Sequence, residues 1–147
     1  VKFDIYGPVY DYPYWEKCKA VINRFPENID FNYHGPVAKG DIPSRLKEVH
    51  FLFMPTRGEN FGHTILEAMI YGCPAIISDQ TPWRGLADAK AGWDLPLDKP
   101  SGYVNVIEKT IHMDAEEFRL WSDGARDFAY RFVNDPLLMQ QSIQLFE

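Results

Sequence analysis

Apolar and polar positions follow two different periods along this chain, and each period predicts a type of secondary structure. Short apolar runs bounded by Gly or Pro have the length of buried strands. Apolar residues that recur every three or four positions are typical of helices with one buried face. The predicted strands are residues 3–6, 29–34, 49–54, 75–78 and 91–97. The predicted helices are residues 13–25, 42–48, 60–71, 100–112 and 114–132, a short helix from Thr81 and a last helix from Asp135.

Strands and helices therefore alternate along the chain, and the last predicted elements, after residue 97, are all helices. This order predicts an α/β fold with a doubly wound, mostly parallel, Rossmann-like sheet of about five strands. Helices are expected on both faces, followed by a helical C-terminal tail. Residues 29–34 alternate strictly between apolar and polar, which predicts a half-exposed strand at the edge of the sheet. His34 ends that strand and is expected to face solvent rather than to bind a ligand.

The central stretch, residues 49–78, combines two buried strands with a loop and a helix between them. Gly72 stands where the C-terminal cap of a helix favours glycine, and Pro74 prevents the helix from continuing. In an α/β unit of this kind, ligands bind where the carboxyl ends of strands meet the amino ends of helices. We therefore expect a binding site at the loop that follows Pro55.

Two carboxylates, Glu59 in the loop and Glu67 on the helix, stand on either side of the predicted helix start. The expected first turn consists of Asn60, Phe61, Gly62 and His63. Its free N–H groups and the positive end of the helix dipole favour an anion, and Gly62 lets a phosphate approach the backbone. Carboxylates accept hydrogen bonds from paired sugar hydroxyls. The pattern therefore predicts a ligand with a diphosphate between two polyols, such as a nucleotide sugar.

Composition excludes several classes of function. The chain has 147 residues, the size of one domain, and 46% of them are hydrophobic, which predicts a folded core. A net charge of −6 argues against a broad surface for nucleic acid. No apolar run approaches the roughly 20 residues that span a bilayer. Cys18 and Cys73 lack the spacing of metal ligands, so we expect free thiols in a reducing, cytoplasmic compartment.

Several motifs occur in one order along nearly the whole chain. The first strand ends at Gly7-Pro8, the second at Gly35-Pro36-Val37 and the third at Pro55-Thr56. The spaced glutamates follow, within a run at residues 59–74 that also holds Phe-Gly, Glu-Ala-Met and Gly-x-Pro. In these features the chain resembles the C-terminal, donor-binding domain of a GT-B-fold, retaining glycosyltransferase of family 4 (glycosyl transferases group 1).

The resemblance implies a role for each matching residue. Glu59, the candidate catalytic residue, would accept hydrogen bonds from hydroxyls of the transferred sugar, and Glu67 would bind the ribose hydroxyls. Backbone N–H groups in the loop would bind the diphosphate. The residues implied for that contact are Phe61, Gly62 and His63, with Asn60 in the same loop. The turn formed by Gly35, Pro36 and Val37 would meet the base through backbone atoms.

The resemblance also implies a reaction and partners. A hexosyl group would pass from a nucleotide-diphosphate sugar to a glycan or lipid-linked acceptor with retention at the anomeric carbon, without a cofactor or metal. Charge would build on the leaving diphosphate, so the helix start would act electrostatically. The acceptor would lie on an N-terminal domain absent here, so we expect no turnover from this chain alone. Polysaccharide biosynthesis at the inner face of a bacterial membrane, by peripheral association of the full-length enzyme, fits the family.

The chain departs from the family pattern in two places. The family's first strand-helix unit, with its Gly-Arg and downstream Lys, has no match at residues 1–10, so we expect a longer protein in which that unit precedes Val1. Its absence leaves an open position between the strands ending at Gly7 and Met54, which either pair directly or are bridged by another chain in a homodimer. Thr81-Pro82-Trp83-Arg84 replaces a Gly-Gly segment, and Arg84 is either a phosphate contact or a surface residue.

Other classes of protein remain alternatives at this level. One is another GT-B enzyme, such as a sugar-nucleotide epimerase or a phosphorylase, although no lysine site for pyridoxal phosphate is recognisable. A second is a non-catalytic domain that binds a partner and has no affinity for nucleoside diphosphates. A third is a flavodoxin-like regulator, which would not need Glu59. His63 is either a catalytic side chain or, as we expect, a helix-start residue that acts through its backbone.

Overall fold

The computed structural model describes residues 1–135, and the predicted α/β class is confirmed. The chain divides into two compact units, Val1–Ile42 and Pro43–Glu147. Five strands, all parallel to their neighbours, are divided between a sheet of two strands and a sheet of three. The predicted last helix, with Leu138, Met139, Ile143 and Phe146, lies outside the described residues.

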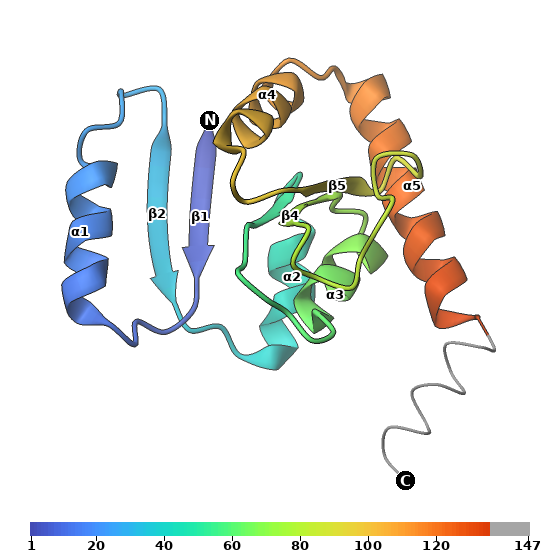
Figure 1. Ribbon diagram of the computed structural model, residues 1–147, viewed down its shortest axis with the longest axis horizontal. Helices are drawn as coiled ribbons and strands as arrows, with labels where there is room; N and C mark the ends of the chain where they lie inside the picture. The colour runs from blue at the N-terminus through green and yellow to red at the C-terminus, as the bar shows by residue number, and fades with distance from the viewer. Residues whose placement is uncertain (136–147) are drawn as a thin grey trace, which may run out of the picture. The chain divides into compact units, whose positions relative to one another are not determined.

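The first unit is a strand, a helix and a second strand. It contains β1 (Lys2–Tyr6), α1 (Tyr12–Ile22) and β2 (Asp30–Gly35), followed by the short 3-10 helix η1 (Lys39–Asp41). Figure 1 shows β1 and β2 running side by side in the same direction, with α1 beside β2. The α1 helix begins after Asp11, whose carboxylate accepts a hydrogen bond of 2.9 Å from the backbone of Tyr14. It ends three residues before the predicted limit, at Ile22, in turns that lead to Pro26.

One face of the two-stranded sheet is aromatic and packs on α1. Trp15 of α1 lies 4.8 Å from the ring of Tyr33, and Phe31 stacks on Phe3 at 5.4 Å. This is the apolar half of the alternating pattern that the sequence shows in both strands. The predicted edge position of β2 holds within the described residues, since β1 is the strand that pairs with it there.

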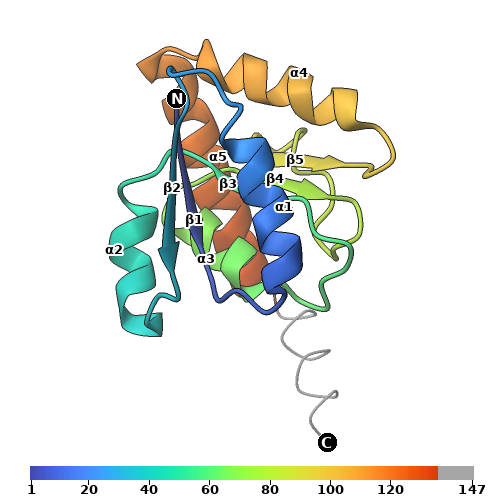
Figure 2. The ribbon, with the colours of Figure 1, turned by 90° about the vertical axis from the view of Figure 1, so that its left-hand side faces the viewer.

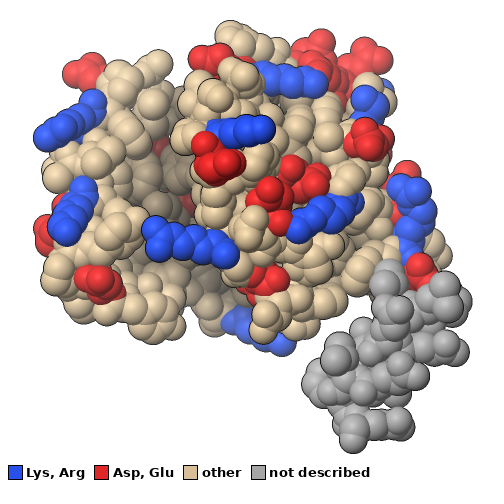
Figure 3. Space-filling model, in the orientation of Figure 1, with Lys and Arg blue, Asp and Glu red and all other residues tan. Residues whose placement is uncertain are grey.

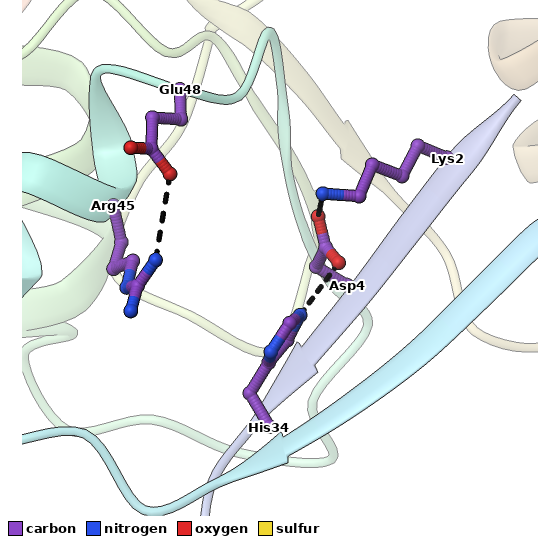
Figure 4. A network of polar contacts seen from close by, with 5 residues as sticks. All are labelled: Lys2, Asp4, His34, Arg45 and Glu48. Carbon is purple, nitrogen blue, oxygen red and sulfur yellow. Dashed lines mark hydrogen bonds and ion pairs between the residues drawn. The ribbon is translucent and has the colours of Figure 1, made fainter.

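The opposite set of positions on the same two strands carries charge. Figure 4 shows Asp4 between Lys2 and His34, with contacts of 3.2 Å and 2.7 Å. Hydrogen bonding from His34, and then from Lys2, holds the pKa of Asp4 below its usual value against partial burial of the carboxylate, and Asp4 in turn raises the pKa of Lys2. The His34 ring stacks on Tyr6 at 4.7 Å and is exposed, as predicted.

The second unit is a three-stranded sheet between helices. After α2 (Ile42–Leu46), where Figure 4 also shows an Arg45–Glu48 ion pair of 3.6 Å, the strand order is β3-β4-β5. The elements are β3 (Leu52–Met54), α3 (His63–Ile70), β4 (Ala75–Ser78), β5 (Gly92–Leu95), α4 (Pro100–Ile111) and α5 (Ala115–Val133). In both Figure 1 and Figure 2, α4 lies above β4 and β5 and α3 lies below them. This unit therefore has the expected helices on both faces.

The central strand β4 is buried throughout, and its alternation divides the core in two. Ala75 and Ile77 pack with α3 and α5, whereas Ile76 packs on the opposite face. The first cluster is centred on Ile65, Met69, Trp83, Leu86, Ala125 and Ala129. The second is centred on Trp93, Tyr103, Val106 and Trp121. Because both faces of β4 are covered, its residues are apolar at successive positions, and this continuous apolar run is the pattern that predicted a buried strand.

Three predictions about elements need correction. The predicted single sheet of about five strands is, within residues 1–135, a sheet of two strands, β1-β2, and a sheet of three, β3-β4-β5. The short helix expected from Thr81 is a series of turns, since the Thr81 hydroxyl accepts from the backbone of Trp83 and closes a tight turn. The strand predicted from Val49 begins at Leu52.

The described surface carries mixed charge. Figure 3 shows lysines and arginines interspersed with aspartates and glutamates over the face in view, so neither sign dominates it. None of the helices within residues 1–135 combines the length and apolarity needed to cross a bilayer.

Cys73 is a small core residue with a free thiol, and it offers a test of the packing in the second unit. Its side chain is buried, and its Sγ–H donates to the carbonyls of Leu46 and Val49 at 2.9 Å and 3.3 Å. Burial raises the pKa of the Cys73 thiol to about 11. At pH 8 only about 0.1% of that thiol is then ionised, so it should resist iodoacetamide.

We expect Cys18, which is partly exposed on α1, to be alkylated first in the native chain. Peptide mass spectrometry after a timed reaction measures both sites. In guanidinium chloride the two thiols should react at similar rates, which controls for chemistry unrelated to the fold. Equal labelling of the two cysteines in the native chain would contradict the buried placement of Cys73.

Candidate functional site

The predicted helix start is present, but it begins later than expected. The α3 helix starts at His63, and Gly62 is its N-cap residue in the left-handed conformation, with φ 81° and ψ 58°. Asn60 and Phe61 therefore precede the helix and do not form its first turn. The reason is local. A residue with a positive φ cannot continue a right-handed helix, so the helix begins after Gly62, and glycine adopts this conformation without a steric cost.

The backbone around Gly62 has N–H groups without an acceptor in the described part of the chain. Its carbonyl accepts from the N–H groups of Ile65 and Leu66, at 2.9 Å and 3.1 Å, and these bonds close the first turn. Within residues 1–135, the N–H groups of Phe61, Gly62, His63 and Thr64 donate no hydrogen bond. Unpaired donors of this kind, together with the helix dipole, make an anion-binding position.

Packing of α3 sets the direction in which the candidate side chains point. Ile65, Ala68 and Met69 are fully buried in the core, which leaves His63 and Glu67 on the outer face. These two residues are four positions apart and lie one above the other on the helix. Side chains on a helix tilt toward its N-terminus, so the Glu67 carboxylate extends toward the helix start.

The end of α3 confirms the expected cap. The N–H of Gly72 donates to the carbonyl of Met69 and the N–H of Cys73 to that of Ala68, both at 2.9 Å, which is a Schellman motif. Pro74 follows and leads into β4. The helix thus has eight residues, held between two glycines, and it places Glu67 in its middle.

Both candidate carboxylates are available for a ligand. Glu59 is exposed in the loop that follows β3, and Glu67 is partly exposed on α3. Neither carboxylate has a hydrogen-bond or ion-pair partner within residues 1–135. The helix start lies between them along the chain, so the arrangement can accept hydrogen bonds on either side of a bound anion.

Residues 78–83, at the end of β4 and in the loop after it, hold the predicted loop in place. The sequence left Arg84 of the same loop open as a phosphate contact, but it did not single out Ser78 or Trp83. Residues 78–83 contact the loop after β3 at three points. The Ser78 hydroxyl donates to the Thr56 carbonyl, and the Glu59 N–H donates to the Gln80 carbonyl at 3.2 Å. Trp83 Nε1 donates to the Phe61 carbonyl at 2.6 Å. A tryptophan inside a polar Thr-Pro-x-Arg turn was the signal that could have found this contact.

Arg84, left open between a phosphate contact and a surface residue, closes its own turn. It is exposed, and its guanidinium donates to the carbonyls of Trp83, at 3.0 Å, and Asp79. On the neighbouring strand, Asp94 accepts from the backbone of Leu86 at 3.1 Å. Both side chains therefore stabilise the connection between β4 and β5.

The predicted base-binding turn lies in the first unit. The strand β2 ends at Gly35, whose carbonyl accepts from Gly7 at 2.9 Å, and the Tyr33 hydroxyl donates to the Gly7 carbonyl at 2.7 Å. Pro36 and Val37 follow the strand in an irregular segment. Because Glu59 to Glu67 belong to the second unit, a shared role of the two groups stays a prediction.

Residues 1–135 contain no group of three or more His, Cys, Asp or Glu side chains placed to hold a metal ion. Polar contacts at the site therefore come from two carboxylates, backbone donors and the imidazole of His63, whose ring lies 4.6 Å from that of Phe61.

A parallel sheet with a glycine-capped helix start at the carboxyl end of its strands is the arrangement in which α/β domains bind ligands. The chain belongs to the family of glycosyl transferases group 1, whose model matches residues 1–112. It is 25% identical over 117 residues to an uncharacterized 41.2 kDa protein in the cps region of Klebsiella pneumoniae. The alignment covers 78% of this chain and 32% of that protein, so the chain spans about a third of the length of the curated relative it matches.

Proposed function

We propose that this chain is the donor-binding domain of a retaining glycosyltransferase of family 4. In this role it binds a nucleotide-diphosphate sugar, and the full-length enzyme transfers the hexosyl group to a glycan or lipid-linked acceptor. Membership of the family of glycosyl transferases group 1 supports the reaction class. The observation that carries the site is the pair of carboxylates, Glu59 and Glu67, around the capped start of α3, neither of which has a polar partner among residues 1–135.

The roles follow from the chemistry of each group. The N–H groups at Gly62 and His63 bind the diphosphate, with the positive end of α3 behind them. As the sugar departs, negative charge grows on that diphosphate, and preorganised donors stabilise it without a metal ion or a cofactor. Glu67 accepts hydrogen bonds from the ribose hydroxyls, and Glu59 accepts them from the transferred sugar.

The remaining partners belong to the longer protein that we propose. The turn at Gly35, Pro36 and Val37 meets the base through backbone atoms. The acceptor binds an N-terminal domain, so the chain alone has no turnover. The relative in the cps region supports a role in polysaccharide biosynthesis at the cell envelope. A cytoplasmic enzyme at the inner face of the membrane, held by peripheral association, suits a lipid-linked acceptor, and a homodimer is a way to pair the open edges of β1 and β3.

Calorimetric titration of the 147-residue chain with UDP, GDP and ADP tests the proposal. We expect one of the three to bind, and Glu67→Ala to weaken that affinity by a factor of about 10–150, since a carboxylate that accepts two hydroxyls contributes about 1.5–3 kcal/mol. Glu108→Ala is the matched control, because Glu108 is an exposed glutamate on α4 without a polar partner within residues 1–135.

Two outcomes count against the proposal. If the wild-type chain binds none of the three nucleotides, it is a non-catalytic member of the fold class. If a nucleotide binds and both glutamate variants keep wild-type affinity, the nucleotide site lies elsewhere on the chain. Equal weakening by Glu67→Ala and Glu108→Ala would point to a general effect of charge.

A further inference from the structure

We infer that Trp83 is a positioning residue for the diphosphate-binding turn, acting through the backbone of Phe61. The inference rests on the proposed function, because it concerns the same donor site. Trp83 belongs to the loop after β4 and does not occupy the predicted ligand position. It therefore adds to the site a side chain that the sequence did not single out, in a loop where only Arg84 was considered as a phosphate contact.

Three hydrogen bonds join the two segments, and they follow the same order along both. Along residues 56–61, a carbonyl, an N–H and a carbonyl are held in turn by groups from residues 78–83. Two of these three contacts use side chains, the hydroxyl of Ser78 and the indole N–H of Trp83. Both residues are buried, with 0% and 2% of their surface exposed, so water does not compete for either bond.

The indole is itself fixed by aromatic packing. Its ring lies 4.5 Å from Phe132, 5.7 Å from Phe61 and 6.3 Å from Phe128. Two of these rings come from α5, whose contacts with α3 are part of the same core cluster. Because the indole is held in the core, its hydrogen bond to the Phe61 carbonyl restrains the exposed loop that carries Glu59.

Peptide planarity converts this bond into an orientation of the phosphate donor. The carbonyl of Phe61 and the N–H of Gly62 belong to one trans peptide plane, in which they point in opposite directions. A carbonyl directed at Trp83 Nε1, at 2.6 Å, therefore directs the Gly62 N–H away from the indole. Without the indole N–H, this plane is free to rotate, and the donor loses its fixed direction.

The test is Trp83→Phe, which removes the N–H donor and keeps an aromatic ring in the core. Calorimetry with UDP, GDP, ADP and inorganic pyrophosphate is run on the 147-residue chain well below its unfolding temperature. We expect the affinity for the nucleotide that binds the wild type to fall about five- to tenfold. Pyrophosphate, which has no base or sugar, should lose affinity by a similar factor.

Trp93→Phe is the matched control, because Trp93 is a buried tryptophan of the other core cluster and its indole N–H has no partner within residues 1–135. Both variants should lower the unfolding temperature, but Trp83→Phe alone should weaken binding. A purely structural role predicts that both variants keep wild-type affinity, and that result overturns the inference.

Ser78→Ala decides the case if Trp83→Phe does not fold. It removes the contact to the Thr56 carbonyl with a small change of volume, and we expect about threefold weaker nucleotide binding. Unchanged affinity in this variant overturns the inference. Failure of the wild-type chain to bind any nucleotide is a different result, because it removes the proposed function and not the contact between the loops.

Discussion

Gly92→Ala is expected to lower the unfolding free energy of the second unit by about 4 kcal/mol or more, which is a large part of the stability of a domain. In the ladder between β4 and β5, Gly92 pairs with Ala75. A Cβ atom at position 92 would lie 2.0 Å from the carbonyl oxygen of Ala75 and 2.6 Å from its backbone nitrogen. Both atoms belong to the central strand, so the overlap cannot be relieved by rotating a side chain.

The backbone conformation adds to this cost. Gly92 has φ +142°, a value that residues with a side chain rarely adopt. Urea unfolding followed by tryptophan fluorescence measures the effect, since Trp93 stacks on Trp121 at 4.0 Å within the same unit. Gly102→Ala is the control, because its new Cβ would meet nothing closer than 4.0 Å and lies in α4, where alanine is favoured. Similar unfolding curves for the two variants would contradict the described ladder.

Capping residues explain why the helix boundaries were largely predictable from the sequence. Asp114 accepts from the backbone of Glu116 and Glu117, at 2.9 Å and 2.8 Å, so it caps α5, which begins within one residue of the predicted start at 114. Gly72 ends α3 by the cap that its position indicated. In both cases the determinant is a residue that acts on its own backbone within a few positions, so no knowledge of the tertiary fold was needed.

The errors occurred where distant contacts decide the local conformation. Thr81-Pro82 has the composition of a helix start, yet the segment is a turn because Trp83 and Leu86 are anchored in the core. Gly62 was placed inside a helical turn, whereas its left-handed conformation ends the helix there. The peptide group that joins Phe61 to Gly62 accepts a hydrogen bond from Trp83, which is 21 residues from Gly62 along the chain. Local sequence patterns do not carry this information.

The pattern of apolar and polar residues in each strand predicted whether one or both faces of that strand are buried. Lys2, Asp4 and His34 interact on one side of β1 and β2, and Phe3 stacks on Phe31 on the other. The strand β4 has no polar residue before Ser78, and both its faces are buried. The sequence thus distinguished the edge strand from the central strand correctly. Which strands share a sheet depends on pairing between segments far apart in the sequence, and such pairing leaves no mark in either strand alone.

Gly62→Ala is the substitution with the largest effect expected at the candidate site. A Cβ atom there would lie 2.8 Å from Ile65 Cδ1, 3.0 Å from Trp83 Nε1 and 3.1 Å from Glu59 Cγ. The φ of +81° adds backbone strain of about 1–3 kcal/mol, so the turn has to change shape. That change displaces the N–H donors and the Glu59 side chain together. We expect the affinity for a nucleoside diphosphate to fall more than about tenfold, a larger factor than the loss of one hydrogen bond produces.

Gly58→Ala separates this effect from a general sensitivity of the loop. Gly58 lies four residues earlier in the same loop, its φ is not positive, and an added Cβ would meet nothing within 4 Å. Calorimetry should therefore give wild-type affinity for Gly58→Ala and strongly reduced affinity for Gly62→Ala, with circular dichroism confirming that both variants fold. If Gly62→Ala bound the nucleotide as tightly as Gly58→Ala, the left-handed turn would not be the diphosphate position. The two carboxylates would then bind a ligand without the help of the helix start.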